Sequence, residues 1–221
     1  MATENHGSEH LGIDPRITEF LRERWGIEDF FPPQLEALPV VLEGKSLMLT
    51  IPTASGKSLV AYIGMINRLI KDMKGMRGAY VVPLKALASE KFEDLKEMAG
   101  AVGLTVGLAI GDRGSESNGV DDSDILVCTS EKLDSILSTR SGFLENLGVV
   151  VSDEFHLLND YSRGPTLEVT ISRIMHIRPE AQIIALSATV GNSEELARWL
   201  GAKHVKSDWR PIPLHYGIMT D

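Results

Sequence analysis

The feature that most constrains the fold is the stretch KSLMLTIPTASGKSL at residues 45–59. Its apolar run at 47–51 is too short for a helix and stops at Pro52, which predicts a buried strand. A loop of small residues follows at 52–56, and apolar residues then recur every three or four positions, which predicts a helix to about Met73. A strand, a loop and a helix in this order aim backbone N–H groups and the positive end of a helix dipole at one point, which suits a phosphate chain.

Two side chains after the loop have the chemistry that a bound triphosphate needs. Lys57 can reach the β- and γ-phosphates, and the Ser58 hydroxyl can ligate the Mg²⁺ that bridges them. The strict phosphate-loop pattern, G-x-x-x-x-G-K-[ST], requires glycine where this chain has Ile51, so the match is incomplete. The alternative is a Gly-Lys-Ser turn that begins an ordinary surface helix.

Composition excludes several classes of protein. The chain of 221 residues has one cysteine, Cys128, which excludes an internal disulfide and a cysteine-based metal cluster and is typical of a reducing cytoplasm or nucleus. No apolar stretch approaches the roughly 18 residues of a membrane span, and the polar N-terminus lacks a signal-peptide core, so we expect neither membrane association nor export. The net charge of −9 provides no general basic field, so a nucleic acid would have to be held by a local face.

The remaining pattern predicts a doubly wound, mostly parallel α/β sheet flanked by helices, in a single domain. Two helices precede the phosphate-loop stretch, one capped by Asp14 and ended by Gly26, the other running from the prolines at 32–33 to about Glu43. After that stretch, strands and helices alternate, and several strands are continuous aliphatic runs, as expected when helices cover both faces.

The boundaries of these elements follow from the same periodicity. The predicted strands are 79–82, 104–110, 125–128, 149–151 and 183–186, and the predicted helices begin at residues 85, 130, 166 and 193. Asn192 and Glu195 resemble a capping box for the last helix. Residues 111–124 predict a polar, mobile surface loop.

Two adjacent carboxylates, Asp153 and Glu154, follow the aliphatic strand at 149–151. They stand at the C-terminal end of that strand, the edge at which open α/β sheets bind ligands. In a phosphate-loop enzyme one carboxylate is needed to hold Mg²⁺, and a second can orient or deprotonate the attacking water. The alternative is a solvated acidic pair that closes a strand, which is harder to sustain with a candidate phosphate loop on the same sheet.

Other polar side chains fall near the same edge. Gln34, at a helix start just before the phosphate-loop stretch, has an amide that could pair with an adenine edge, although an exposed glutamine is the simpler interpretation. His156 follows the acidic pair, and Ser187 and Thr189 end a later strand, where they could contact one another or the γ-phosphate region. A half-buried histidine with satisfied hydrogen bonds is the alternative for His156.

Six short motifs, in this order and spacing, resemble motifs Q, I, Ia, Ib, II and III of superfamily 2 DExH helicases. They are Gln34 after Phe-Pro-Pro, Pro52-Thr53-Ala54-Ser55-Gly56-Lys57-Ser58, Pro83-Leu84-Lys85-Ala86-Leu87, Thr129-Ser130-Glu131-Lys132, Asp153-Glu154-Phe155-His156 and Ser187-Ala188-Thr189. The RGPTLE stretch at 163–168 and the SDWRP stretch at 207–211 are similar to the Ski-like branch, most closely to its archaeal DNA helicases of the Holliday-junction-migration type. The first motif of this family commonly lacks the glycine at the position of Ile51.

The resemblance implies a RecA-like fold, ATP and Mg²⁺ as cofactors, and a role for each matching residue. Gln34 would read adenine, while Thr53, Ala54, Ser55, Gly56 and Lys57 would hold the phosphates. Ser58 and Asp153 would hold Mg²⁺, and Glu154 would activate water. His156, Ser187 and Thr189 would couple the nucleotide state to the nucleic acid, and Lys85, Thr129 and Ser130 would contact the backbone of one strand. Phe155 stands where relatives often have an aliphatic residue, a change that we expect to be structural and mild.

The resemblance also implies partners outside this sequence. Residues 14–206 would form the first of two motor domains, after a flexible tail at 1–13 and before a linker that starts at 207–221. We expect single-stranded or forked DNA and the second motor and C-terminal domains as partners of a 3'-5' translocase in replication-fork repair or recombination, in an archaeal cytoplasm or a eukaryotic nucleus. Because the second domain supplies arginine fingers, residues 1–221 alone should bind ATP·Mg weakly and barely hydrolyse it.

Three other functions stay open on the residues alone. An RNA helicase of the same superfamily would use the same backbone contacts, which carry little base information. A small-molecule phosphotransferase would need an arginine-bearing lid, and the candidate segment at 111–124 is acidic, with Arg113 as its one arginine. A non-catalytic ATP-gated scaffold is disfavoured because both Asp153 and Glu154 are present.

Overall fold

A computed structural model of the chain describes residues 11–110, 117–118, 122–139 and 141–212. Within these residues one eight-stranded sheet has the order β4-β3-β5-β2-β6-β7-β1-β8. Its strands are β1 (Leu47–Thr50), β2 (Arg77–Val82), β3 (Val106–Ala109), β4 (Ser117–Asn118), β5 (Ile125–Thr129), β6 (Leu147–Ser152), β7 (Gln182–Ser187) and β8 (Lys203–Lys206). All neighbouring strands run parallel except the antiparallel pair β3 and β4, which confirms the predicted mostly parallel sheet.

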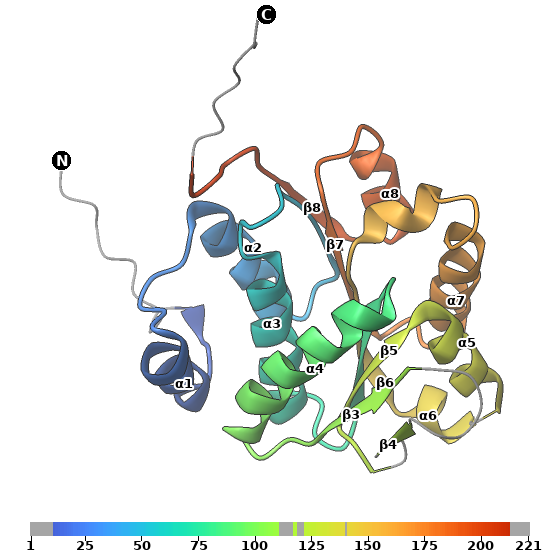
Figure 1. The fold of residues 1–221 in the computed structure, drawn as a ribbon, viewed down its shortest axis with the longest axis horizontal. Coiled ribbons are helices and arrows are strands. Elements are labelled where there is room, and N and C mark those ends of the chain that lie inside the picture. The colour runs from blue at the N-terminus through green and yellow to red at the C-terminus, as the bar shows by residue number, and fades with distance from the viewer. Residues whose placement is uncertain (1–10, 111–116, 119–121, 140, 213–221) are drawn as a thin grey trace, which may run out of the picture.

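Helices cover both faces of this sheet (Figure 1). They are α1 (Pro15–Trp25), α2 (Pro32–Leu42), α3 (Lys57–Lys71), α4 (Lys85–Gly100), α5 (Ser130–Thr139), α6 (Ser141–Glu145), the 3-10 helix η2 (Phe155–Asn159), α7 (Gly164–Ile177) and α8 (Ser193–Trp199). Helices α1 to α4 pack on one face and α5 to α8 on the other, around two separate clusters of buried apolar side chains. In β1, Leu47 and Leu49 belong to the first cluster and Met48 to the second. This double burial explains why the strands show no polar alternation.

The helix ends show which local predictions were correct. The Asp14 carboxylate caps α1 by accepting from the Arg16 backbone N–H at 3.0 Å, and Gly26 ends the helix with a left-handed φ of 65°. The predicted capping box at α8 is wrong, because the Asn192 side chain makes no cap hydrogen bond there and its backbone lies at φ −97° and ψ 16°, outside the extended region that capping requires. Helix α7 begins at Gly164, two residues before the predicted start.

Two strands, β4 and β8, were not predicted from the sequence. Strand β8 is a polar edge strand in which Val205 is buried and Lys203 and Lys206 are exposed, so its sequence carries almost no apolar signal. Strand β4 lies inside the segment predicted to be a mobile loop, of which 111–116 and 119–121 are outside the described residues. Within the described part of the chain, every helix is too short or too polar to cross a membrane.

Residues near both ends of the described chain pack on the domain. Ile13, assigned to the flexible tail by the sequence analysis, is buried beside α1, whereas residues 1–10 lie outside the described residues. After β8, the chain returns over the start of α2, where the Trp209 and Phe31 rings have centroids 4.7 Å apart. The predicted linker therefore begins against the phosphate-loop side of the sheet, and residues 213–221 are not described.

Candidate nucleotide and nucleic-acid site

The loop between β1 and α3 has the backbone that the sequence predicted for phosphate binding. Ala54 and Gly56 both adopt left-handed φ angles, 64° and 74°, before the chain enters α3 at Lys57. Such turns expose backbone N–H groups on the inner side of the loop. The Ser55 side chain is buried and its hydroxyl donates to the Trp209 carbonyl at 3.2 Å, so the returning C-terminal segment fastens one side of the loop.

The Gln34 side chain holds the other side of the loop between β1 and α3 by hydrogen bonds. Its Oε1 accepts from the Phe31 backbone N–H at 2.8 Å, and its Nε2 donates to the Gly56 carbonyl at 3.0 Å. A Cβ at position 56 would collide with that amide and would displace it from its bond to the Gly56 carbonyl, and the φ of 74° itself favours glycine. The Gln34 amide is thus bound to the chain itself and is 3% exposed, and an adenine contact would require it to share or release one of these bonds.

Lys57 is the first residue of α3 and is the main cation of the loop. Its side chain is 7% exposed, yet its Nζ has no hydrogen-bond partner among the described residues. An ammonium group kept from water without a partner is costly unless an anion binds it. This buried, unpaired Nζ therefore fits the phosphate chain that the sequence predicted.

The Asp153 carboxylate accepts two hydrogen bonds, one of them from a buried tyrosine. Its Oδ1 accepts from the Glu154 backbone N–H at 2.9 Å, and its Oδ2 accepts from the Tyr80 hydroxyl at 2.9 Å. Burial and then the Asp153 charge raise the pKa of Tyr80 well above its usual value, while a hydrogen bond with the Ser58 side chain opposes that shift. Tyr80 therefore bonds directly to Asp153, and its pKa also responds to Ser58, the other residue predicted to hold the Mg²⁺.

These two residues fit a Mg²⁺ site of the kind that completes its shell with phosphate oxygens and water. In the described ranges no group of three His, Cys, Asp or Glu side chains could hold a metal ion, at this position or at any other. Mg²⁺ is usually held by one or two protein oxygens together with substrate phosphates, which agrees with one hydroxyl and one carboxylate. The 6% exposure of Asp153 and its two donors keep that carboxylate oriented.

Glu154 stands at a sharp turn between β6 and η2. Its φ of 49° and ψ of 44° are left-handed, a conformation that is uncommon for a residue with a side chain and that concentrates at functional sites. Its Oε2 lies 3.3 Å from Nδ1 of His156, and both side chains are about one-quarter exposed. The turn thus directs the predicted water-activating carboxylate toward solvent while Asp153 remains buried.

The predicted coupling residues are only partly brought together. Ser187 ends β7 beside Thr50 of β1, and its hydroxyl donates to the Ala188 carbonyl at 2.8 Å. Thr189 is exposed. No hydrogen bond among the described residues joins His156 to Ser187 or Thr189, so their coupling role stays a prediction.

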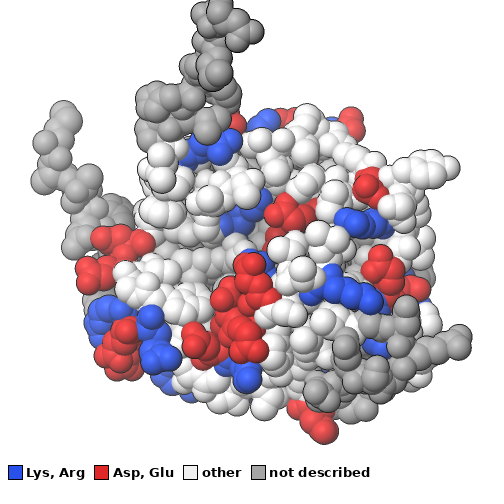
Figure 2. Space-filling view, in the orientation of Figure 1, with Lys and Arg blue, Asp and Glu red and all other residues white. Residues whose placement is uncertain are grey.

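The predicted nucleic-acid contacts lie at the ends of two neighbouring strands. Val82 of β2 is the register partner of Thr129 of β5, and these strands lead into α4 at Lys85 and into α5 at Ser130. Lys85 is exposed, whereas Thr129 and Ser130 are 7% and 5% exposed. Figure 2 shows acidic and basic side chains interspersed over this side of the molecule, with no continuous basic field.

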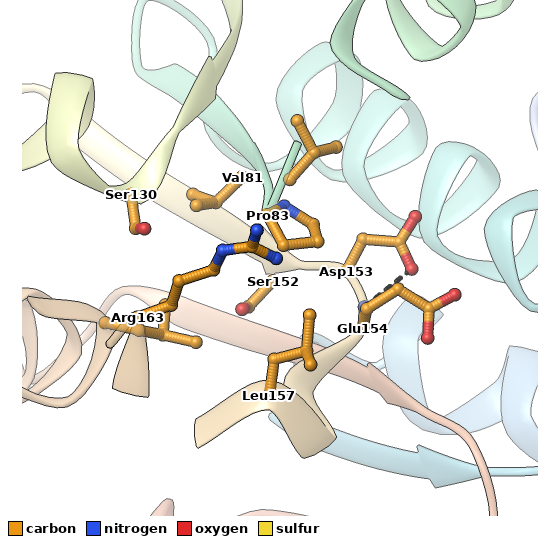
Figure 3. A pocket seen from close by; sticks show the side chains of 10 residues that line it. Val81, Pro83, Ser130, Ser152, Asp153, Glu154, Leu157 and Arg163 are labelled. Atoms are coloured by element: carbon orange, nitrogen blue, oxygen red, sulfur yellow. Dashed lines mark hydrogen bonds between the residues drawn. The ribbon is translucent and has the colours of Figure 1, made fainter. Parts of the chain in front are cut away.

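A pocket at these strand ends contains a residue to which the sequence analysis gave no role. It is lined by Val81, Val82, Pro83, Ser130, Ser152, Asp153, Glu154, Leu157, Arg163 and Leu167. Figure 3 shows the Arg163 side chain extending across it from the start of α7. Tyr80 and Trp209 were missed as well. A tyrosine inside a continuous apolar strand is one available signal, because its buried hydroxyl needs a partner.

Comparisons with known proteins agree with this geometry. A family model described as DEAD/DEAH box helicase matches residues 31–196. The chain is 48% identical over 211 residues to "ATP-dependent DNA helicase Hel308" of Pyrococcus horikoshii, a match that covers 95% of this chain and 28% of the relative. The protein of that name from Thermococcus kodakarensis is 49% identical over 211 residues, covering 95% of this chain and 18% of the relative.

A solved structure extends the likeness to the fold. The crystal structure of the DUF1998 helicase MrfA bound to DNA superposes with a TM-score of 0.76 at 27% identity, over 89% of this chain and 30% of that one. The chain thus spans less than a third of the length of each of these proteins. The six motifs, their common sheet edge and the family match together show that this chain belongs to the DEAD/DEAH box helicase family.

Proposed function

We propose that the chain is the ATP-binding motor domain of an ATP-dependent DNA helicase that acts in replication-fork repair or recombination. The observation that carries this proposal is the buried, unpaired Nζ of Lys57 next to the Ser58, Tyr80 and Asp153 cluster. DNA is favoured over RNA because relatives at 48% and 49% identity are named DNA helicases. A small-molecule phosphotransferase lacks support, since the likeness covers helicase motifs outside the phosphate loop as well.

The residues divide the work of ATP hydrolysis. Lys57 and the loop N–H groups neutralise and position the phosphates, and Ser58 and Asp153 would hold Mg²⁺, which supplies charge stabilisation at the β- and γ-phosphates when bound. Glu154, presented by its left-handed turn, is placed to accept a proton from water. Nucleic acid would run across the ends of β2 and β5, next to Glu154 at the end of β6.

Nucleotide binding tests the first half of this proposal. A fluorescent ATP analogue should bind residues 1–221 weakly but more tightly with Mg²⁺ than without it. Glu154→Gln should preserve this binding, because the carboxylate acts on water, and in a longer protein that turns over ATP it should abolish hydrolysis. Normal hydrolysis by Glu154→Gln in that protein would refute the assignment of Glu154.

The preference for DNA or RNA tests the second part of the proposal, that the chain belongs to a DNA helicase. ATP turnover of a protein extended beyond Asp221 should be stimulated by single-stranded DNA more than by RNA of equal length. Stimulation by RNA alone would favour the RNA helicase alternative. Phosphoryl transfer from labelled ATP to a small metabolite, with no response to either nucleic acid, would favour the phosphotransferase.

A further inference from the structure

The pocket shown in Figure 3 has two chemically different ends. At one end, Asp153 and Glu154 direct their carboxylates away from Arg163. On the other side lie Ser130 and Ser152, and the Arg163 side chain reaches from that side toward Pro83. In the described ranges, the Arg163 guanidinium makes no hydrogen bond or ion pair, even though two carboxylates line the same pocket. A cation is therefore available inside the pocket, on the side from which those carboxylates point away.

The Ser152 hydroxyl is the second observation that points to a ligand. Ser152 is 1% exposed and lines the pocket, and its Oγ has no hydrogen-bond partner among the residues described. Buried hydroxyl groups in folded proteins are almost always hydrogen-bonded, so a partner from outside the chain is expected. An anionic oxygen would accept this hydroxyl proton.

Ser130 adds a helix start at the same end. It is the first residue of α5, which runs for 10 residues to Thr139. The first N–H groups of such a helix have no partner within it, and the helix dipole places partial positive charge there. In α5, the Lys132 N–H donates to the Thr129 hydroxyl at 3.4 Å. A guanidinium, an unpaired hydroxyl and a helix N-terminus directed at one pocket are together suited to a phosphate group.

Arg163 is held in place by the turn that precedes it. The Asp160 carboxylate accepts from the backbone N–H groups of Ser162 and Arg163, each at 3.0 Å, and the Asp160 carbonyl accepts from the Gly164 N–H at 2.9 Å. Gly164 also sits against the Leu158 carbonyl so closely that a Cβ would collide with it. The guanidinium is thus presented by a fixed turn, which lowers the entropy cost of binding a ligand.

We propose that Arg163, Ser152 and the N-terminus of α5 bind one phosphate of a nucleic-acid backbone. The inference rests on the proposed function, because it places a strand across the ends of β2 and β5. A nucleotide phosphate is the less suitable source, because the Asp153 carboxylate that would hold its Mg²⁺ is bonded by the Tyr80 hydroxyl and points away from Arg163. The ATP phosphates and the backbone phosphate therefore occupy opposite sides of the end of β6.

Binding of a fluorescently labelled single-stranded dT oligonucleotide tests the proposal. Arg163→Gln should weaken binding about tenfold at low salt, since a charged hydrogen-bonding partner is lost. The slope of log K against log salt concentration should become shallower by about 0.7, the value for one phosphate contact to a single strand. Arg163→Lys should retain part of the affinity, because it keeps the charge without the fork geometry.

The matched control is Arg22→Gln, which removes the same charge from an exposed position on α1 and should change neither affinity nor slope. Ser152→Ala provides a second test that keeps the charge, and it should weaken oligonucleotide binding severalfold. Melting temperatures verify that each variant is folded. If Arg163→Gln is unfolded, Ser152→Ala decides the outcome.

The outcomes separate this inference from the proposed function. The phosphate site would be overturned if folded Arg163→Gln kept the wild-type affinity and salt slope. If Arg163→Gln is unfolded, wild-type affinity in Ser152→Ala would overturn it. Either result would leave the helicase proposal standing. Weaker binding of the ATP analogue with unchanged oligonucleotide binding would assign the pocket to the nucleotide and also overturn it. Failure of the wild-type chain to bind the oligonucleotide at low salt would count against the nucleic-acid role of the whole domain.

Discussion

Asp153, at the end of β6, is 6% exposed and accepts two hydrogen bonds, whereas Lys85, just after the end of β2, is exposed and makes no hydrogen bond or ion pair within the described residues. We call the first region, Lys57, Ser58, Tyr80 and Asp153, the nucleotide edge. The second, Lys85, Thr129 and Ser130, is the nucleic-acid edge. In the nucleotide edge, Tyr80 and Asp153 are ordered by their hydrogen bonds and the Lys57 side chain is buried, whereas the one cation of the nucleic-acid edge, Lys85, is exposed. Single substitutions should therefore have large effects at the first and small effects at the second.

Lys57→Ala should cause the largest loss. Removing the one buried ammonium of the loop should weaken binding of an ATP analogue by about 100-fold, because a charge-assisted contact in a buried site is lost. Titration of the fluorescent analogue measures this loss. Lys71→Ala, at the other end of α3 with its Nζ on the Gly12 carbonyl, is the matched control and should bind normally. Equal affinity of the two variants would remove the phosphate role from Lys57.

Tyr80→Phe should act on the metal-dependent part of binding alone. Without its hydroxyl, Asp153 loses the donor to its Oδ2, so the tightening of nucleotide binding by Mg²⁺ should fall about tenfold, as for other groups that orient metal ligands. Binding measured in EDTA should not change.

Tyr62→Phe is the control for Tyr80→Phe. The centroids of the Tyr62 and Tyr80 rings lie 5.5 Å apart, but the Tyr62 hydroxyl donates to Asp94, which has no predicted role in metal binding. It should leave the Mg²⁺ effect intact. An equal loss of the Mg²⁺ effect in both variants would show that general packing, and not the bond to Asp153, is responsible.

Gln34→Ala should have an intermediate effect that appears first in stability. It leaves the Phe31 N–H and the Gly56 carbonyl without partners, which should lower the free energy of unfolding by about 1 to 3 kcal/mol in chemical denaturation. Affinity for an ATP analogue should fall more than affinity for a guanine analogue if Gln34 also reads adenine. An equal fall for both bases would limit Gln34 to holding the loop.

Lys85→Ala should have the smallest effect. An exposed lysine is a screened point charge, so its loss should weaken oligonucleotide binding by only about two- to threefold. Lys96→Ala, farther along α4 with its Nζ over the Phe92 ring, is the control and should have no effect. A wild-type salt slope that indicates roughly six or more phosphate contacts would contradict the comparison between the two edges, because it would require an extensive basic surface.

The sequence was sufficient for features that depend on local periodicity or on residues that are adjacent in the chain. Continuous aliphatic runs identified β2, β5, β6 and β7, and the turn at Gly56 followed by Lys57 identified the loop. It was insufficient for β8, which is one buried valine in a polar edge strand, and for Tyr80, whose role depends on two residues distant in sequence. The bond from Gln34 to the Gly56 carbonyl was equally hidden, because it joins elements 22 positions apart.

Strand β6 ends at Ser152, and this residue and the two that follow it have side chains that face three different surroundings. Ser152 faces Arg163, Asp153 faces Tyr80, and Glu154, after the left-handed turn, approaches His156. Two peptide bonds separate the first from the third, which leaves no flexible spacer between them. A rotation of this short piece of backbone would move all three together. Coupling between a bound nucleotide and a bound nucleic acid would thus need no chain of intervening contacts, because both ligands would contact neighbouring residues of one short segment.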